Sequence, residues 1–114
     1  MIWQALTELA TVVETETGVK TTLDPAAVNP PVIVIDPPEI SAATQGGYTM
    51  TVPVTLVGIS PADAKNTQAL LDTVPALLTA CGENATSPTT YTTTQNTTYP
   101  AYRVLTTLTV RRTQ

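Results

Sequence analysis

Apolar residues near the start of the chain recur at spacings of three and four. They are Trp3, Leu6, Leu9, Ala10 and Val13. This spacing places them on one face of a helix, which we predict over residues 2–17. Gly18 stands where a glycine commonly ends a helix.

A second apolar stripe with helical spacing lies between residues 70 and 81. Its members are Leu70, Leu71, Val74, Leu77, Leu78 and Cys81. We predict that Ser60 caps the start of this helix, with Pro61 as its first residue and Asp63 in its first turn. Gly82 is expected to end it.

Alternation with a period of two predicts strands elsewhere. The clearest runs from Tyr48 to Val57, where Tyr48, Met50, Val52, Val54 and Leu56 share one face. The last strand follows the same rule, because Tyr102, Val104, Thr106, Leu108 and Val110 alternate with Arg103, Leu105, Thr107, Thr109 and Arg111. Pro53 lacks a backbone donor, which indicates an edge position or a bulge.

Three shorter strands complete the expected sheet, over residues 19–23, 32–35 and 90–94. The segment Val32–Ile35 is four β-branched residues bounded by Pro30–Pro31 and Pro37–Pro38. Such an uninterrupted apolar run is typical of a short strand that is covered on both faces.

These elements follow one another in the order α-β-β-β-α-β-β. With 114 residues, the chain is long enough for one core but not for two, so residues 1–114 are expected to form one domain. We predict an α+β fold in which two helices pack on one face of a four- to five-stranded mixed or antiparallel sheet.

Composition and charge narrow the function classes. The formal net charge is −4, which disfavours a dedicated nucleic-acid reader because phosphates would be repelled. There is no His and one Cys, so catalysis by His, a His-ligated metal and an internal disulfide are excluded. Neither a signal peptide nor an apolar run of membrane-spanning length is visible, so we expect folding in the cytoplasm and no membrane.

Two clusters could carry chemistry, but each has a simpler explanation. Ser60 and Lys65 resemble a Ser–Lys pair, yet Ser60 serves better as a helix cap. Asp36 and Glu39 could face a cation, but two carboxylates are too few for a Ca²⁺ loop. We therefore expect no enzyme activity, no cofactor and no metal, and we expect Cys81 to be a buried, unreactive thiol.

The second face of the predicted sheet is the most informative feature. Threonine accounts for 25 of the 114 residues. Five of these threonines fall on the face away from the helices: Thr49, Thr51, Thr55, Thr107 and Thr109. In a monomer this semi-polar face would be exposed to solvent, whereas a ring or stack of identical subunits could cover it.

Several short motifs resemble the tail terminator proteins of long-tailed phages, above all those of actinobacterial phages. One is the run Asp-Pro-Ala-Ala-Val-Asn-Pro-Pro at residues 24–31, followed by an aliphatic strand and Pro37–Pro38. Another is Tyr-Pro-Ala-Tyr-Arg at residues 99–103, before the last strand. The order of the predicted elements is also similar, so the resemblance covers nearly the whole chain.

The resemblance implies a structural virion protein that is assembled in the host cytoplasm. Such proteins form a hexameric ring on the head-proximal end of the tail tube, stop its polymerisation and join the neck proteins of the head. DNA passes through the ring without being specifically bound. The expected partners are therefore further copies of the chain, the tail tube protein and a head–tail connector or neck protein.

Within such a ring, charged residues have expected places. Arg103, Arg111 and Arg112 are candidate contacts to neighbouring subunits or to the tube, together with the five threonines of the second face. Asp36, Glu39 and Glu83 are candidate acids of the DNA passage, because a lining of like charge does not hold DNA.

Two other function classes remain open. One is a head–tail connector or neck protein of the same particle, which differs in its binding partner. The other is a threonine-rich β adhesin or carbohydrate-binding module. That class needs export and exposed aromatic residues, whereas this chain has one Trp, four Tyr and no Phe.

Overall fold

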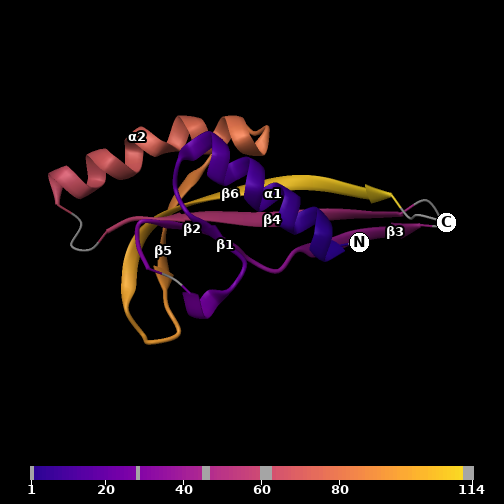
Figure 1. Cartoon of the computed structure of the whole chain (residues 1–114), viewed down its shortest axis with the longest axis horizontal. Coiled ribbons are helices and arrows are strands. Elements are labelled where there is room, and N and C mark those ends of the chain that lie inside the picture. The colour runs from indigo at the N-terminus through magenta and orange to yellow at the C-terminus, as the bar shows by residue number, and fades with distance from the viewer. Residues whose placement is uncertain (1, 28, 45–46, 60–62, 112–114) are drawn as a thin grey trace.

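Two helices lie on one side of a single sheet, as the α+β prediction requires (Figure 1). The computed structural model describes residues 2–27, 29–44, 47–59 and 63–111. The elements are α1 (Ile2–Thr17), β1 (Thr21–Thr22), the 3-10 turn η1 (Pro25–Ala27), β2 (Val32–Ile35), β3 (Glu39–Thr44), β4 (Gly47–Val57), α2 (Ala64–Cys81), β5 (Ser87–Thr92) and β6 (Thr98–Arg111). The molecule is elongated, measuring 50 × 29 × 21 Å.

The sheet has six strands, so the predicted four to five were too few. The missing strand is β3, and four strands instead of three therefore stand between the helices. Glu39–Thr44 shows no clear alternation and contains two alanines. It is a strand because β4 extends beyond β2 and offers backbone partners there, from Glu39 opposite Thr51 to Thr44 opposite Gly47.

Strand β4 is the centre of the sheet, whose order is β1-β2-β4-β6-β5. Strand β6 pairs with it antiparallel along its whole length, and β2 and then β3 share its other side. Among the described strands, β1 and β2 are the one pair that runs parallel. The sheet is therefore mixed, as predicted.

Pro53 lies in the middle of the sheet, so the predicted edge position was wrong. Its carbonyl accepts the backbone N–H of Asp36 over 3.0 Å, at the junction where β2 ends and before β3 begins. In an antiparallel strand the N–H and C=O of one residue point to the same side. The backbone N–H that proline lacks would therefore point to this junction. No hydrogen bond between β4 and β6 is lost.

The main core lies between the helices and the sheet, as the two periodicities predicted. Leu6, Leu9 and Val13 of α1 and Leu70 and Leu77 of α2 pack on alternate residues of the strands. Those strand residues are Ile33, Ile35, Met50, Val52, Val54, Leu56, Val104 and Val110. Leu71, which the sequence placed in the apolar stripe, is 46% exposed instead.

The glycines predicted to end the two helices are confirmed, whereas the predicted N-cap of α2 is corrected. Gly18 and Gly82 follow α1 and α2 with positive φ angles of 70° and 67°, as expected. The N-cap of α2 is Asp63, whose carboxylate accepts the backbone N–H of Asn66 over 2.8 Å. The helix therefore begins later than the Ser60 cap predicted; Ser60 and Pro61 lie outside the described residues.

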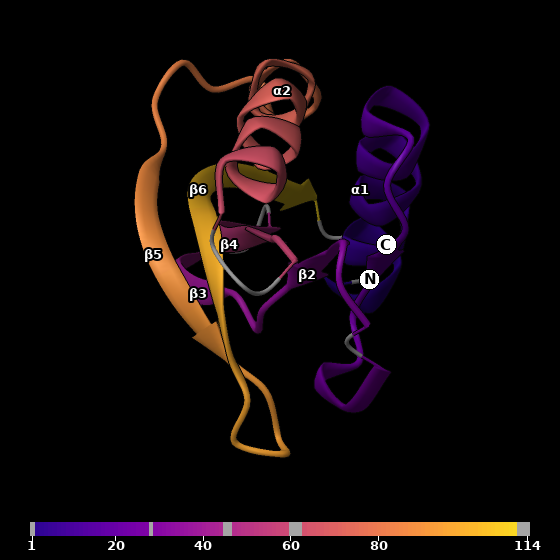
Figure 2. The ribbon, with the colours of Figure 1, turned by 90° about the vertical axis from the view of Figure 1, so that its left-hand side faces the viewer.

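A second, smaller core lies on the other side of the sheet. Val32, Val34 and Val57 are buried there against Tyr91 and Tyr99. These tyrosines face each other across the β5–β6 hairpin, which projects away from the helices on that side (Figure 2). Strand β2 is therefore covered on both faces, as its four consecutive apolar residues predicted.

Candidate interaction surface

Among the described residues, none forms a layer over one half of the second sheet face. It consists of three successive cross-strand pairs of β4 and β6: Thr49 with Thr109, Thr51 with Thr107, and Pro53 with Leu105. We call these six residues the open face. Both helices lie on the opposite side of the sheet, and the β5–β6 hairpin folds under its other end (Figures 1 and 2).

The open face is less polar than its threonine content suggests. Leu105 is 56% exposed in the pair with Pro53. Thr107 and Thr109 are exposed, and Thr49 and Thr51 are half-buried. A threonine side chain adds a methyl group beside its hydroxyl, so the surface combines hydrogen-bonding groups with apolar area. Protein interfaces are on average about as apolar as the rest of the surface, so a mixed surface of this kind is compatible with a subunit contact.

The structure brings together four of the five predicted threonines of this face. Thr55 differs, because it is fully buried and its hydroxyl donates to the Asp36 carboxylate over 3.4 Å. It therefore cannot contact a partner directly. Pro53 and Leu105 are the two members that sequence reasoning did not single out as contacts, although Leu105 interrupts the polar residues on its side of β6.

The predicted arginine contacts are separated along β6. Arg103 pairs with Thr55 beside the open face, and its side chain is exposed. Arg111 is the last described residue of β6, where its backbone pairs with Gly47. Arg112 lies outside the described residues.

Asp36 is an acid whose surroundings shift its carboxyl pKa. It is half-buried at the β2–β3 junction. Burial raises the pKa of its carboxyl above the usual range, although the nearby Arg103 guanidinium and the hydrogen bond from Thr55 act in the opposite direction. The same carboxylate, after burial, raises the pKa of Tyr91. The Arg103 charge and the Thr55 hydrogen bond therefore offset only part of the cost of burying the ionised Asp36 carboxylate.

The three candidate acids of the DNA passage do not form one cluster. Glu39 begins β3, pairs with Thr51 and is exposed next to the open face. Glu83 follows Gly82, the C-cap of α2. Within the described residues, no three His, Cys, Asp or Glu side chains converge as a metal site. Asp36 and Glu39 lie close in sequence at the β2–β3 junction, whereas Glu83 follows α2. The three acids are therefore not expected to line one surface.

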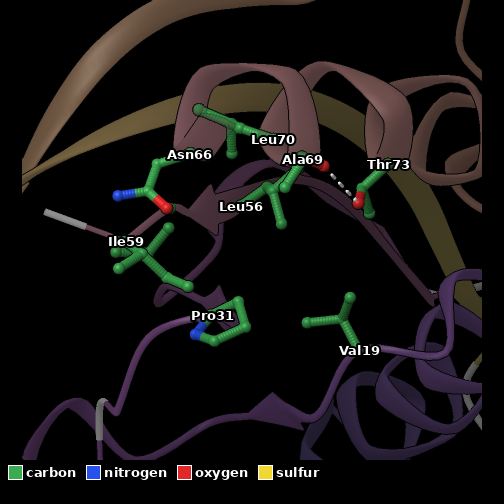
Figure 3. A pocket seen from close by; sticks show the side chains of 10 residues that line it. Val19, Pro31, Leu56, Ile59, Asn66, Ala69, Leu70 and Thr73 are labelled. Carbon is green, nitrogen blue, oxygen red and sulfur yellow. Dashed lines mark hydrogen bonds between the residues drawn. The ribbon is translucent and has the colours of Figure 1, made fainter. Parts of the chain in front are cut away.

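An apolar pocket lies between the start of α2 and the end of β4 (Figure 3). Its volume is about 130 Å³, and Val19, Pro31, Leu56, Ile59 and Leu70 contribute to its walls. Sites for small organic ligands usually measure about 300–1,000 Å³. This pocket is smaller than such sites, and none of the described residues that line it is charged.

Cys81 is buried at the end of α2. Burial, and secondly the Glu83 carboxylate, raise the pKa of its thiol to about 11. At neutral pH the sulfur is therefore almost wholly protonated, and a thiol is a poor nucleophile compared with a thiolate.

Comparison with protein-family models, with curated proteins and with solved structures finds no match. Neither helix of the described chain is long and apolar enough to cross a membrane.

Proposed function

We propose that this chain is a tail terminator protein, a structural component of a phage virion. In this proposal identical subunits form a ring, of six copies by the family resemblance, at the head-proximal end of the tail tube. The ring stops tube growth, offers the surface that joins the neck proteins of the head, and lets DNA pass. The subunits assemble in the host cytoplasm and stay in the virion.

The observation that carries the proposal is the open face. An antiparallel sheet often leaves one face in water, and that face is then mostly polar, whereas here it carries a 56% exposed leucine. Complete burial of a leucine side chain contributes about 1.5–3 kcal/mol. Because each subunit of a ring presents the same surface, this gain is repeated at every contact.

The charges support a passage for DNA that does not bind it. The chain has nine acidic and five basic residues, and a ring multiplies the net charge of −4. Each Lys or Arg that touches phosphate adds salt-dependent affinity, which would retard DNA ejection. Among the three candidate acids, the exposed Glu39 is the one best suited to such a lining, because Asp36 and Glu83 are half-buried.

Immunogold labelling of tails from an infection that produces no heads tests the function. We expect label at one end of each tail, the end that would join the head. Label along the tube, at the host-binding tip or absent from tails contradicts a terminator. Label on heads but not on tails indicates a neck protein instead.

A further inference from the structure

The outer side of α1 carries a row of exposed residues at intervals of four. The row consists of Trp3, Thr7, Thr11 and Thr15, and Trp3 is 66% exposed. Residues four apart are neighbours along one face of a helix. The core residues of α1 lie on its opposite face, toward its own sheet. We call these four residues the outer row.

The threonine hydroxyls of the outer row bond to the backbone of their own helix. Thr7 donates to the Trp3 carbonyl over 2.9 Å, Thr11 to the Thr7 carbonyl over 3.1 Å, and Thr15 to the Thr11 carbonyl over 2.8 Å. Each hydroxyl proton therefore keeps an acceptor when water is removed. Because a polar group is costly to bury mainly when it lacks a hydrogen bond, the outer row can be covered at small cost.

We propose that the outer row of α1 packs on the open face of a second copy of this chain. A helix on a sheet is one of the stable ways in which protein layers pack. The open face cannot receive its own α1, because both helices of the subunit lie on the other side of the sheet (Figures 1 and 2). The contact joins two different surfaces, so further copies can add in the same way until a ring closes. It rests on the proposed function in one respect, because it names the partner of the open face.

The two surfaces repeat at nearly the same interval. Four residues advance a helix by about 6 Å, and two residues advance a strand by about 6.8 Å. Over two such intervals the difference is about 1.6 Å, which is small compared with a side chain. A helix that runs along the strands can therefore place Trp3, Thr7 and Thr11 on the three successive cross-strand pairs of the open face.

Charge favours this partner. The charged residues of α1 are all acidic, namely Glu8, Glu14 and Glu16. Among the described side chains of β4 and β6, the charged one is Arg103, which is exposed and lies two residues before Leu105 on the same face. Opposite charges meet if the end of α1 with Glu14 and Glu16 lies toward Arg103. The negative end of the helix dipole adds to this attraction.

Glu39 also borders the open face, but it lies away from Arg103. Glu39 pairs with Thr51, whereas Arg103 pairs with Thr55, four residues further along β4. At ~3.4 Å per residue the two pairs are about 14 Å apart along the strand. Salt at physiological concentration screens exposed charges over about 8 Å. Glu39 therefore opposes the attraction at Arg103 only weakly.

Crosslinking between copies tests this contact. Two variants of the full chain, Thr7→Cys and Thr107→Cys, each place a thiol at an exposed position near the middle of its surface. The two variants are mixed and treated with a short bismaleimide. We expect a covalent dimer that contains one copy of each variant, and no dimer from either variant alone. A chain with both substitutions should give a ladder of longer oligomers, because every copy then carries both thiols.

Matched controls locate the contact. The wild-type chain, whose Cys81 is buried, should not crosslink. Leu71→Cys places a thiol on the exposed side of α2 and should not crosslink with Thr107→Cys. In the chain with two added cysteines, Arg103→Glu should lower the oligomer yield severalfold. Lys65→Glu makes the same charge change at an exposed position of α2 and should leave the yield unchanged.

Several results would overturn the inference. Dimers of Thr107→Cys alone would do so, because two open faces would then meet each other. The absence of mixed dimers would do so as well, as would mixed dimers that form equally with Leu71→Cys. Equal yields with Arg103→Glu and Lys65→Glu would also contradict it, since the charges would then have no part in the contact.

The crosslinking experiment separates this inference from the proposed function. It needs no tail and no head, so a failed terminator assignment leaves its outcome unchanged. Conversely, a chain that is found at the tail end but gives no mixed dimers would overturn this contact alone.

Discussion

The hydroxyl of Thr106 donates a hydrogen bond to the backbone carbonyl of Cys81 over 2.8 Å, and both groups are buried. This bond joins the middle of β6 to the last turn of α2, whose carbonyls have no partner within the helix. A single threonine on the core face of the sheet thus supplies a hydrogen-bond donor to a carbonyl at the end of α2.

Replacement of Thr106 by valine is expected to lower the free energy of unfolding by about 1–3 kcal/mol. The substitution keeps the shape of the side chain but leaves the Cys81 carbonyl buried without a donor. Thr107→Val changes the next residue of the same strand, which is exposed, and should change the free energy by less than about 0.5 kcal/mol. Urea denaturation of both variants measures the difference; equal values would show that water supplies the missing bond.

The main core predicts a large effect at Leu77, which is fully buried. Leu77→Ala should lower the free energy of unfolding by roughly 2–5 kcal/mol, because it removes apolar contacts and leaves a cavity. Leu71→Ala is the matched control on the same helix, since Leu71 is 46% exposed. Chemical denaturation should show a much smaller loss for this control. A loss below about 0.5 kcal/mol at Leu77 would contradict the helix orientation.

Asp36 predicts an unusual pH dependence. Its pKa is raised in the folded protein, so the folded state binds this proton more tightly than the unfolded state does. The stabilising contribution of the group is fully present below its unfolded pKa of ~3.9 and is lost as pH rises through the folded value. Asp36→Asn should therefore make the isolated subunit more stable at neutral pH. The advantage should shrink as the solution is acidified.

Free energies of unfolding for both proteins, measured from pH 7 down to pH 4, test this dependence. Glu39→Gln is a suitable control, because Glu39 is exposed and lies three residues away. An advantage for Asp36→Asn that grows on acidification would contradict the argument, as would a loss of stability at neutral pH.

The open face predicts a variant that folds but does not assemble. Leu105→Lys should alter the free energy of unfolding by less than about 0.5 kcal/mol, because the side chain is already largely in water. Self-association should be lost, since each subunit would place a charge in the contact. Leu71→Lys puts the same charge on an exposed leucine of the helix layer. Sedimentation of the two variants should show assembly for Leu71→Lys only.

The sequence predicted the parts of the fold whose pattern reflects burial. The alternation of residues 48–57 and the uninterrupted Val32–Ile35 run both follow from which faces are covered. Strand β3 escaped prediction because it is an edge strand that depends on free backbone positions of β4 rather than on its own side chains. The early cap at Ser60 was wrong because Asp63 offers the same interaction closer to the apolar stripe.

The candidate surface was predictable in part for the same reason. Alternation alone placed Thr49, Thr51, Thr107 and Thr109 on one face, and the structure shows them paired. The burial of Thr55 was not predictable, because it results from the β5–β6 hairpin folding under the sheet and from Asp36 at a distant point in the chain. The cavity beside Trp3 and Pro37 likewise joins α1 to the β2–β3 junction, which no local pattern connects.

Cryo-electron microscopy of assembled phage tails tests the central claim most directly, namely that the open face builds a ring of this chain. We expect a closed ring of six copies at the head-proximal end, in which Leu105 and the threonine pairs of the open face are buried against the next subunit. A single copy per particle would contradict the account, as would a ring whose open face lies in solvent.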